Sequence, residues 1–348
     1  MKVLVCGGAG YIGSHTCVAL IEQGQEVVIY DNLCRGTLAA VDHVRQLSGA
    51  QVRFVQGDVR DRGTLETLLA TGFHAVIHFA ALKIMSESCQ YPLAYFDNNV
   101  TGTVALLQAM RATGVQQLVF SSSAAVYGDP ETVPITEEAP LRASNPYSHT
   151  KLVMEQLIGE VCDARPSFSA AILRYFNPAG AHPSGLMGED PCGLPTNLMP
   201  YVSQVAAGMH PRLSVFGGDY PTRDGTGVRD YIHVMDLADA HVRALDVLQH
   251  GGCHVLNLGT GRGYSVLEVI AAFERVSGCR IPYEIVARRV GDVAEVWADT
   301  SRAEKALGWH AQYDLLRMCA DAWRWQSMHP QGCQSSQPIE AQRQASIG

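Results

Sequence analysis

The chain has 348 residues, 47% of them hydrophobic, and a formal net charge of −8 at pH 7. This length and apolar content suit one large or two medium domains with a buried core. An acidic chain without a basic run is not expected to bind nucleic acid. No segment approaches 18 consecutive apolar residues and no secretory signal precedes the first expected strand, so we expect a soluble, cytoplasmic protein without a membrane partner.

Short apolar segments recur through the first half of the chain with longer segments of helical spacing between them. The short segments predict strands at 3–5, 27–30, 52–55, 75–79, 118–121 and 170–173. Helical spacing is clearest at 12–23 and 92–112. Strands that alternate with helices predict a parallel sheet covered on both faces, which is a Rossmann-like doubly wound α/β fold.

After Asn177 the composition changes to segments rich in Pro, Gly and Asn. We therefore expect a first domain over 1–176 and a smaller, loop-rich substrate domain over 177–330. The second domain is expected to be discontinuous, because the chain returns to the sheet within about 229–260. Residues 331–348 have few large apolar side chains and are expected to form a disordered tail. The ten cysteines lack metal-ligand spacing, so no metal site is expected.

A glycine-rich turn, GGAGYIG, joins the first expected strand to the first expected helix. Glycines there allow a tight turn and a close approach to a diphosphate, while the helix N-terminus supplies N–H donors. The position of the motif between strand and helix favours NAD as the cofactor of the first domain. The residues of this turn expected to contact NAD are Gly7, Gly10, Tyr11, Ile12 and Gly13.

Acidic residues follow the second and third expected strands. Asp31, eighteen residues beyond Gly13, is placed to accept hydrogen bonds from a ribose and to repel the extra phosphate of NADP. Asp31 could instead only begin a turn with Asn32, and Arg35 could soften the preference for NAD. Asp58 is interpreted either as an adenine contact or as a turn residue. Asn32 and Val59 complete the expected cofactor contacts at these strand ends.

Tyr147 and Lys151 lie four residues apart and would share one face of a helix. A nearby ammonium favours the phenolate, which can act as a base. Lowering the pKa of the phenol by about 3 units requires about 4 kcal/mol, which calls for a second cation such as oxidised nicotinamide. Ser123, at the end of a strand, is expected to face Tyr147 at the carboxyl edge of the sheet. Alternatives are a solvated helix face and a serine-rich loop.

Several longer motifs resemble the extended short-chain dehydrogenase/reductase family and, within it, the UDP-glucose 4-epimerases. They lie at 10–16, 175–178, 183–190, 197–200 and 224–238. The resemblance implies reversible, NAD-dependent interconversion of UDP-galactose and UDP-glucose through a 4-keto intermediate, with Tyr147 as the base. Lys151 would hold Tyr147 anionic, and Ser123 would bind the sugar.

The resemblance also implies further contacts and a homodimer. Lys83, Asn98 and Phe176 match residues that contact the cofactor. The residues that match those holding a UDP-hexose are Asn177, Asn197, Arg229, Tyr231 and Arg289. A guanidinium fork suits a diphosphate better than an ammonium does.

Some positions depart from the family pattern. Ser148 and His149 replace the frequent Gly and Lys between Tyr147 and Lys151, with little expected loss. Val296 stands where an epimerase restricted to plain hexoses has Tyr, so we expect room for N-acetylhexosamines unless a neighbouring side chain fills it. A nucleotide-sugar dehydratase of the same family is one alternative, but it needs acids where this chain has Ala124 and Ala125. A non-catalytic NAD-sensing module is the other.

Overall fold

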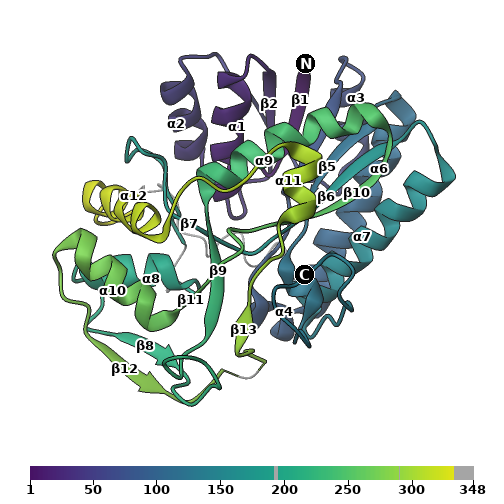
Figure 1. Ribbon diagram of the computed structural model, residues 1–348. Helices are drawn as coiled ribbons and strands as arrows, with labels where there is room; N and C mark the ends of the chain where they lie inside the picture. The colour runs from purple at the N-terminus through teal and green to yellow at the C-terminus, as the bar shows by residue number, and fades with distance from the viewer. Residues whose placement is uncertain (192–194, 290, 333–348) are drawn as a thin grey trace.

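A seven-stranded, entirely parallel sheet forms the larger part of the molecule (Figure 1). The computed structural model describes residues 1–191, 195–289 and 291–332, so most of the expected tail lies outside the described residues. The order of strands is β10-β6-β5-β4-β1-β2-β3. Their bounds are β1 Lys2–Cys6, β2 Glu26–Asp31, β3 Arg53–Gln56, β4 Ala75–His78, β5 Gln117–Ser121, β6 Ser169–Tyr175 and β10 Gly252–Leu258.

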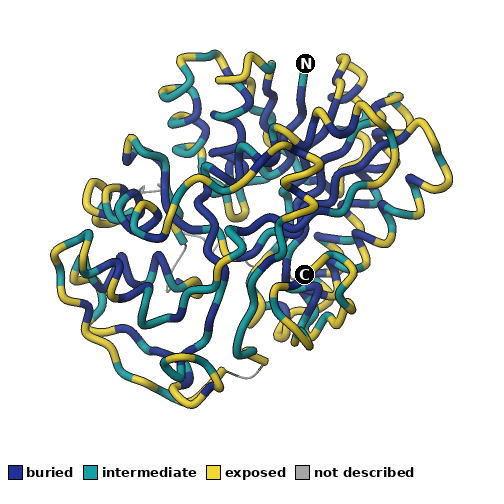
Figure 2. The backbone as a smooth tube through the Cα atoms, in the orientation of Figure 1, coloured by how far each residue is buried: buried dark blue, intermediate teal, exposed yellow. Residues whose placement is uncertain are grey.

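Helices cover both faces of this sheet, which confirms the predicted α/β fold class. In β1, Val3 and Val5 pack in one core cluster with α1, α2, α9 and α11, while Leu4 and Cys6 pack in another with α3, α6 and α7. Figure 2 shows the strands as the buried centre of this part. The bounds are α1 Tyr11–Glu22, α2 Leu38–Ser48, α3 Arg62–Leu69, α6 Gly102–Thr113, α7 Pro146–Ala164, α9 Val234–Val247 and α11 Ser301–Leu307.

The helix expected over 92–112 is interrupted by a π-helical turn. It begins as α5 (Pro92–Tyr95), widens into the π-helix η1 (Phe96–Thr101) and continues as α6. The short helix α4 (Met85–Gln90) precedes it. Single π-turns within helices are rare and are frequently found at functional sites. This turn carries Asn98, which lines the cavity described below, and Asn99, which has no exposed surface.

Most of the chain after Asn177 forms a second, smaller layer of sheet and helices. Strand β9 pairs with β7, β11 and β13, and β8 pairs with β12. Helices α8, α10 and α12 pack around a separate apolar core. The strands are β7 Asn177–Ala179, β8 Leu213–Phe216, β9 Val228–His233, β11 Gly263–Ser265, β12 Tyr283–Val286 and β13 Glu295–Val296. The helices are α8 Leu198–Ala206, α10 Val266–Ser277 and α12 Leu315–Met328, and the 3-10 turns are η2 Ala124–Tyr127 and η3 Leu248–His250.

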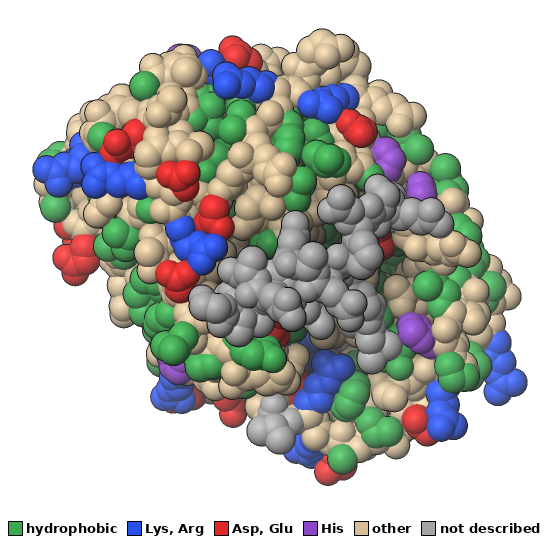
Figure 3. Space-filling model, turned by 180° about the vertical axis from the view of Figure 1, so that it is seen from behind, with side chains coloured by type: hydrophobic (Ala, Val, Ile, Leu, Met, Phe, Trp, Pro, Cys, Tyr) green, Lys and Arg blue, Asp and Glu red, His purple; other side chains and the backbone are tan. Residues whose placement is uncertain are grey.

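The surface carries a mixture of side-chain types. Seen from behind, basic, acidic and hydrophobic side chains are interspersed (Figure 3). Within the described part of the chain, no helix is both long enough and apolar enough to cross a bilayer.

Candidate active site

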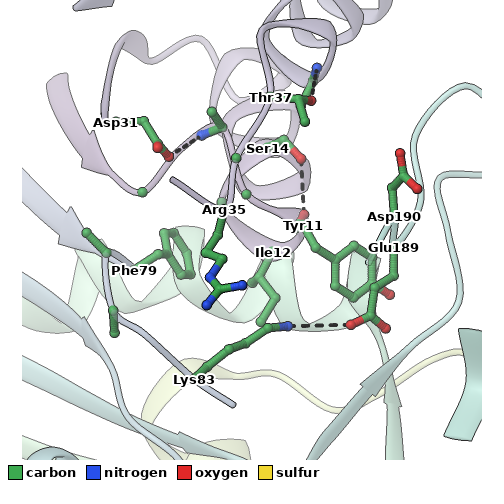
Figure 4. A pocket seen from close by; sticks show the side chains of 18 of the residues that line it. Tyr11, Ile12, Ser14, Asp31, Arg35, Thr37, Phe79, Lys83, Glu189 and Asp190 are labelled. Atoms are coloured by element: carbon green, nitrogen blue, oxygen red, sulfur yellow. Dashed lines mark hydrogen bonds and ion pairs between the residues drawn. The ribbon is translucent and has the colours of Figure 1, made fainter. Parts of the chain in front are cut away.

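A cavity of about 250 Å³ opens at the carboxyl ends of the central strands, where open α/β sheets place their ligands (Figure 4). It brings together residues that lie far apart in the sequence. The predicted site residues that line it are Gly7, Gly10, Tyr11, Ile12, Gly13, Asp31, Asn32, Val59, Lys83, Asn98, Tyr147, Lys151 and Asn197. The predicted residues that do not line it are Asp58, Ser123, Phe176, Asn177, Arg229, Tyr231, Arg289 and Val296.

The glycine turn has the shape that a diphosphate cradle requires. Gly7 adopts φ +81°, and a Cβ there would lie 2.6 Å from the amide nitrogen of Ala80. A Cβ on Gly13 would lie 2.2 Å from the carbonyl oxygen of Gly7. Helix α1 begins beyond Gly10 with no side-chain cap and no acid in its first turn, so its amide groups are left for a bound anion. The turn therefore fits the diphosphate of a dinucleotide.

Asp31 is both a turn residue and a lining residue of the cavity. Its Oδ2 accepts a hydrogen bond from the amide of Ala9 at 3.0 Å, and its Oδ1 accepts one from the amide of Leu33 at 2.8 Å. Burial raises the pKa of this carboxyl, and the two backbone hydrogen bonds lower it. Arg35 also lines the cavity, but its guanidinium binds both carboxylate oxygens of Glu87, at 2.5 and 2.6 Å. Arg35 is thus held by an acid other than Asp31.

Asp58 lies beside the cavity and is held by neighbouring polar groups. It accepts hydrogen bonds from the Arg60 guanidinium at 2.8 and 2.9 Å and from the Asn32 amide at 3.1 Å. The hydrogen bond with Arg60 is the main reason that the pKa of this carboxyl falls to about 2. Asp58 is therefore ionised at neutral pH and orients Asn32, which faces the cavity.

Tyr147 and Lys151 lie on the first turns of α7, whose start is fixed by a reciprocal cap. Asn145 Oδ1 accepts a hydrogen bond from the Ser148 amide at 2.9 Å, and Ser148 Oγ accepts one from the Asn145 amide at 3.1 Å. Ser148 is fully buried. Ser148 forms half of the cap that positions Tyr147.

The charges at this pair depend on burial. Lys151 Nζ donates to the carbonyl oxygen of Ser121 at 2.6 Å. Burial lowers the pKa of Lys151 to about 7, although the Glu155 carboxylate acts to raise it. Burial raises the pKa of Tyr147 above its usual value, while a hydrogen bond with Ser123 lowers it. Among the protein's own groups, burial raises the pKa of Tyr147 more than its hydrogen bond with Ser123 lowers it. The phenolate therefore still needs a second cation nearby, such as oxidised nicotinamide.

The sequence did not predict a buried ion pair that involves the same helix as Tyr147 and Lys151. Glu155 on α7 and Arg174 on β6 are each about 95% buried, and their closest oxygen and nitrogen lie 2.6 Å apart. The Ser122 hydroxyl also donates to Glu155. The pair therefore joins α7 to the strand ends that carry the serines. Its members look like ordinary surface residues in sequence, because only the fold brings the two elements together.

Predicted sugar-binding residues lie mainly on neighbouring strands of the second layer. Asn177 on β7 is in register with Tyr231 on β9, and Arg229 on β9 is in register with Val296 on β13. Val296 packs against a small apolar cluster that includes Phe176 and Ala124. The residues are thus grouped by strand pairing, next to the segment that follows Ser123.

The rim of the cavity joins the two layers. Lys83 Nζ lies 3.4 Å from Glu189 Oε1 (Figure 4), and the same oxygen accepts a hydrogen bond from Asn197 at 2.7 Å. The Arg289 guanidinium lies 3.9 Å from the centre of the Phe216 ring and 3.5 Å from the carbonyl oxygen of Thr196, a lining residue. Other lining residues absent from the prediction include Phe79, Tyr175, Met187, Glu189, Thr196 and Trp325. Glu189 lies within the motif at 183–190, but no spacing rule gave it a role.

Comparison with known proteins gives consistent results. The family model for GDP-mannose 4,6 dehydratase matches residues 4–322. The UDP-glucose 4-epimerase of Bacillus subtilis (strain 168) is 54% identical over 339 residues, covering 97% of this chain and 100% of the relative. That of Dictyostelium discoideum is 53% identical over 338 residues, covering 96% and 98%.

Solved structures agree with the sequence relatives. The UDP-glucose 4-epimerase of Stenotrophomonas maltophila, with bound NAD and formylated UDP-arabinopyranose, superposes with a TM-score of 0.93 at 53% identity, covering 95% of this chain and 99% of that one. The enzyme of Bifidobacterium longum, in complex with NAD⁺ and UDP, gives 0.93 at 49% identity, covering 96% and 100%. The chain belongs to the UDP-glucose 4-epimerases, within the broader family that the GDP-mannose 4,6 dehydratase model describes.

Proposed function

We propose that the protein catalyses the reversible, NAD-dependent 4-epimerisation of UDP-galactose and UDP-glucose. The observation that carries this proposal is the convergence of Tyr147 and Lys151 with the glycine turn and Asp31 on one cavity. The chain aligns over nearly its whole length with relatives named for this activity, and structural neighbours contain NAD with UDP or a UDP-sugar.

Each residue has a defined task in the proposed reaction. The glycine turn and Asp31 would hold NAD, which would supply reversible hydride transfer at carbon 4 of the sugar. Tyr147 takes the proton of the 4-hydroxyl and later gives it back, while Ser123 hydrogen-bonds the same oxygen. Lys151 stabilises the phenolate form of Tyr147. Arg229 and Arg289 hold the diphosphate while the 4-keto sugar turns over.

The decisive experiment is a conversion assay. Purified protein is incubated with UDP-galactose, and the two UDP-hexoses are resolved by chromatography. We expect UDP-glucose to form without any added reductant, because the cofactor is regenerated in each cycle. If bound NAD is present but UDP-galactose is unchanged, the proposal fails and the NAD-sensing alternative gains support.

The dehydratase alternative is not favoured by the site. Elimination of water requires an acid and a base beside the sugar. The two residues after Ser123 are Ala124 and Ala125, which begin the turn η2. Their methyl groups cannot transfer a proton, so the oxidised sugar has no partner there for elimination.

We also propose that the protein accepts UDP-N-acetylglucosamine and UDP-N-acetylgalactosamine. Val296 is partly buried against the small apolar cluster that includes Phe176, and a valine there occupies less volume than a tyrosine. Val296→Tyr is expected to reduce conversion of UDP-N-acetylgalactosamine about tenfold or more and to leave UDP-galactose conversion within about twofold, since a pocket change of this size affects binding by about 1–3 kcal/mol. Equal losses on both substrates would contradict this role.

A homodimer in the cytoplasm is our proposal for the state of the protein. Leu93 on α5, Phe96 on η1 and Val153 on α7 are exposed, and these helices contact one another. Sedimentation velocity of wild type and Leu93→Glu tests this, since a charge in an apolar interface is expected to produce monomers.

The eight cysteines among the described residues are free thiols, as in a reducing compartment.

We further propose a division into an NAD-binding domain over residues 1–176 and a UDP-sugar-binding domain over 177–330. The separate apolar core around α8, α10 and α12 supports it. Strand β10 lies in the large sheet beside β6, so the first domain would include this later segment.

A further inference from the structure

Two cysteines meet where the end of α7 packs against the edge of the large sheet. Cys162 lies in the last turn of α7, and Cys253 is the second residue of β10. Helix α7 contacts β10, which is the edge strand beside β6. Cys162 lies fifteen positions beyond Tyr147, roughly 22 Å along the helix at about 1.5 Å per residue. Neither cysteine lines the cavity, so the pair is separate from the candidate active site.

The alternation of side chains along β10 places Cys253 on the face of the sheet that α7 covers. Val255 packs against the core cluster that contains Cys162 and Ala170. The next residue, Leu256, belongs to the cluster on the opposite face. Side chains two positions apart in a strand share a face, so Cys253 points to the same side as Val255. Its register partner on β6 is Ala170, and the two cysteines therefore lie over the same part of the sheet.

The backbone on both sides of this contact is held in place. Cys253 lies within the parallel pairing of β10 with β6, and the Ser169 hydroxyl donates to the carbonyl oxygen of the preceding residue, Gly252, at 3.1 Å. Cys162 forms a hydrogen bond with the backbone of Ala170 on the same strand β6. Both cysteines are thus fixed against one strand, and their proximity does not depend on a loop.

The two thiols differ in exposure and in acidity. Cys162 is buried in the apolar cluster, whereas Cys253 is exposed. A hydrogen bond links the two sulfur atoms, and it lowers the pKa of Cys253. The same hydrogen bond, together with burial, raises the pKa of Cys162. The thiolate is the form of cysteine that oxidants attack, so Cys253 combines the exposure and the acidity of a reactive thiol.

We propose that Cys162 and Cys253 form an oxidation site for hydrogen peroxide, in which exposed Cys253 reacts first and buried Cys162 closes a disulfide. The Cys253 thiolate attacks one peroxide oxygen, the O–O bond breaks, and hydroxide leaves, which produces a sulfenic acid. The Cys162 sulfur then attacks the Cys253 sulfur, and the S–O bond breaks with loss of water. In total, two thiols and one peroxide give one disulfide and two waters. The sulfur atoms lose two electrons, and the peroxide gains them.

The disulfide would join two parts of the chain that the sequence separates widely. Helix α7 carries Tyr147 and Lys151 at its other end, and β10 is the strand by which the later part of the chain enters the large sheet. Oxidation would therefore connect the helix of the proposed base to that strand covalently. The inference concerns the thiols alone and does not depend on which reaction the cavity catalyses.

Peptide mapping of the oxidised full-length protein tests the pairing. Reduced protein is treated with hydrogen peroxide, the remaining thiols are alkylated, and tryptic peptides are analysed by mass spectrometry. Residues 152–174 and 244–262 form two tryptic peptides, and each contains one cysteine. We expect these peptides to be joined and to lose two hydrogen atoms in mass, with the chain still migrating as a monomer on a non-reducing gel. Recovery of both peptides in alkylated form, or of either joined to a different cysteine, would overturn the proposal.

Single variants test the order of the two steps. In Cys162→Ala, the sulfenic acid on Cys253 is expected to persist and to be labelled by dimedone, a reagent for sulfenic acids. In Cys253→Ala, buried Cys162 is expected to stay reduced. Cys89→Ala is the matched control, because Cys89 is exposed on α4, and its loss is expected to leave the joined peptides unchanged. Dimedone labelling of Cys89 as fast as that of Cys253 would refute the special reactivity of Cys253, and the unfolding temperature of each variant controls for its fold.

Discussion

At the scale of single residues, the site depends on how burial changes charged groups. Lys151 is buried, and its Nζ donates a hydrogen bond to the carbonyl oxygen of Ser121. Tyr147 is buried too, which disfavours its phenolate. Burial disfavours the Lys151 ammonium and the Tyr147 phenolate, which are the charged forms that catalysis needs. The reaction therefore depends on neighbouring charges and on hydrogen bonds such as the one between Ser123 and Tyr147.

Tyr147→Phe is expected to retain the fold and bound cofactor but to lose about 10²- to 10⁴-fold in kcat, because the ring stays and only the proton-transferring hydroxyl is removed. Steady-state conversion of UDP-galactose checks the loss, and the unfolding temperature controls for the fold. A rate within a few-fold of wild type would show that another group is the base.

Asp31→Asn separates the charge of this residue from its shape. The amide keeps an oxygen for one backbone hydrogen bond but loses the negative charge. Hydrogen bonds to charged groups contribute about 1.5–3 kcal/mol, so NAD affinity is expected to fall about 10- to 100-fold while NADP affinity rises. Titration of both cofactors by fluorescence measures this. Parallel loss of both affinities would mean that Asp31 acts only through the turn.

At the scale of elements, the ends and irregularities of helices place the functional groups. Helix α7 starts at a cap made by Asn145 and Ser148, immediately around Tyr147. Helix α1 starts without a side-chain cap and so presents free amides to the cavity. The π-turn η1 carries Asn98, which lines the cavity, and Asn99, which has no exposed surface. The N-terminus of α7 is capped and fixes Tyr147, whereas the N-terminus of α1 has no side-chain cap and can bind a ligand.

Asn145→Ala is expected to destabilise the protein by about 1 kcal/mol, the usual contribution of a helix N-cap. Because the cap holds the turn that carries Tyr147, kcat is expected to fall several-fold as well. Chemical denaturation and steady-state rates measure the two effects. Asp314→Ala, which removes the cap of α12 outside the cavity lining, is the matched control, expected to cost similar stability without changing kcat. Equal effects on kcat in the two variants would contradict the local role of Asn145.

At the scale of the whole molecule, the interior contains neutral histidines. Burial lowers the pKa of His15 and His78 to about 3 and that of His241 to about 4. One ring nitrogen of each is buried with no hydrogen-bond partner. Below the unfolded pKa of about 6.5, the unfolded chain binds protons that the folded chain does not, so stability is complete above that pH and falls as the pH drops toward 4.

We therefore expect the free energy of unfolding to fall by about 2 kcal/mol per histidine between pH 6.5 and pH 5, at about 1.4 kcal/mol per pH unit. Denaturant titrations at several pH values measure the slope. His241→Phe removes one titrating ring between Phe79 and Tyr175 and is expected to reduce the slope by about a third. The same slope in the variant would show that the loss comes from other groups.

Local sequence patterns by themselves determined much of this protein. The six expected strands, the glycine turn with Asp31, and Tyr147 with Lys151 can all be identified in the sequence, because each depends on periodicity or short spacing. The parallel doubly wound fold follows from those patterns, since alternating strands and helices have few other ways to bury their apolar faces.

Other features were decided by the tertiary structure alone. The Glu155–Arg174 pair and the bridge from Lys83 to Glu189 each join segments that no spacing rule relates. Their energies and pKa shifts depend on burial, and burial of a polar side chain is set by packing rather than by its neighbours in sequence. The chain itself therefore specifies which chemical groups are available and on which elements they lie. Only the folded interior determines which of them touch and in which charge state.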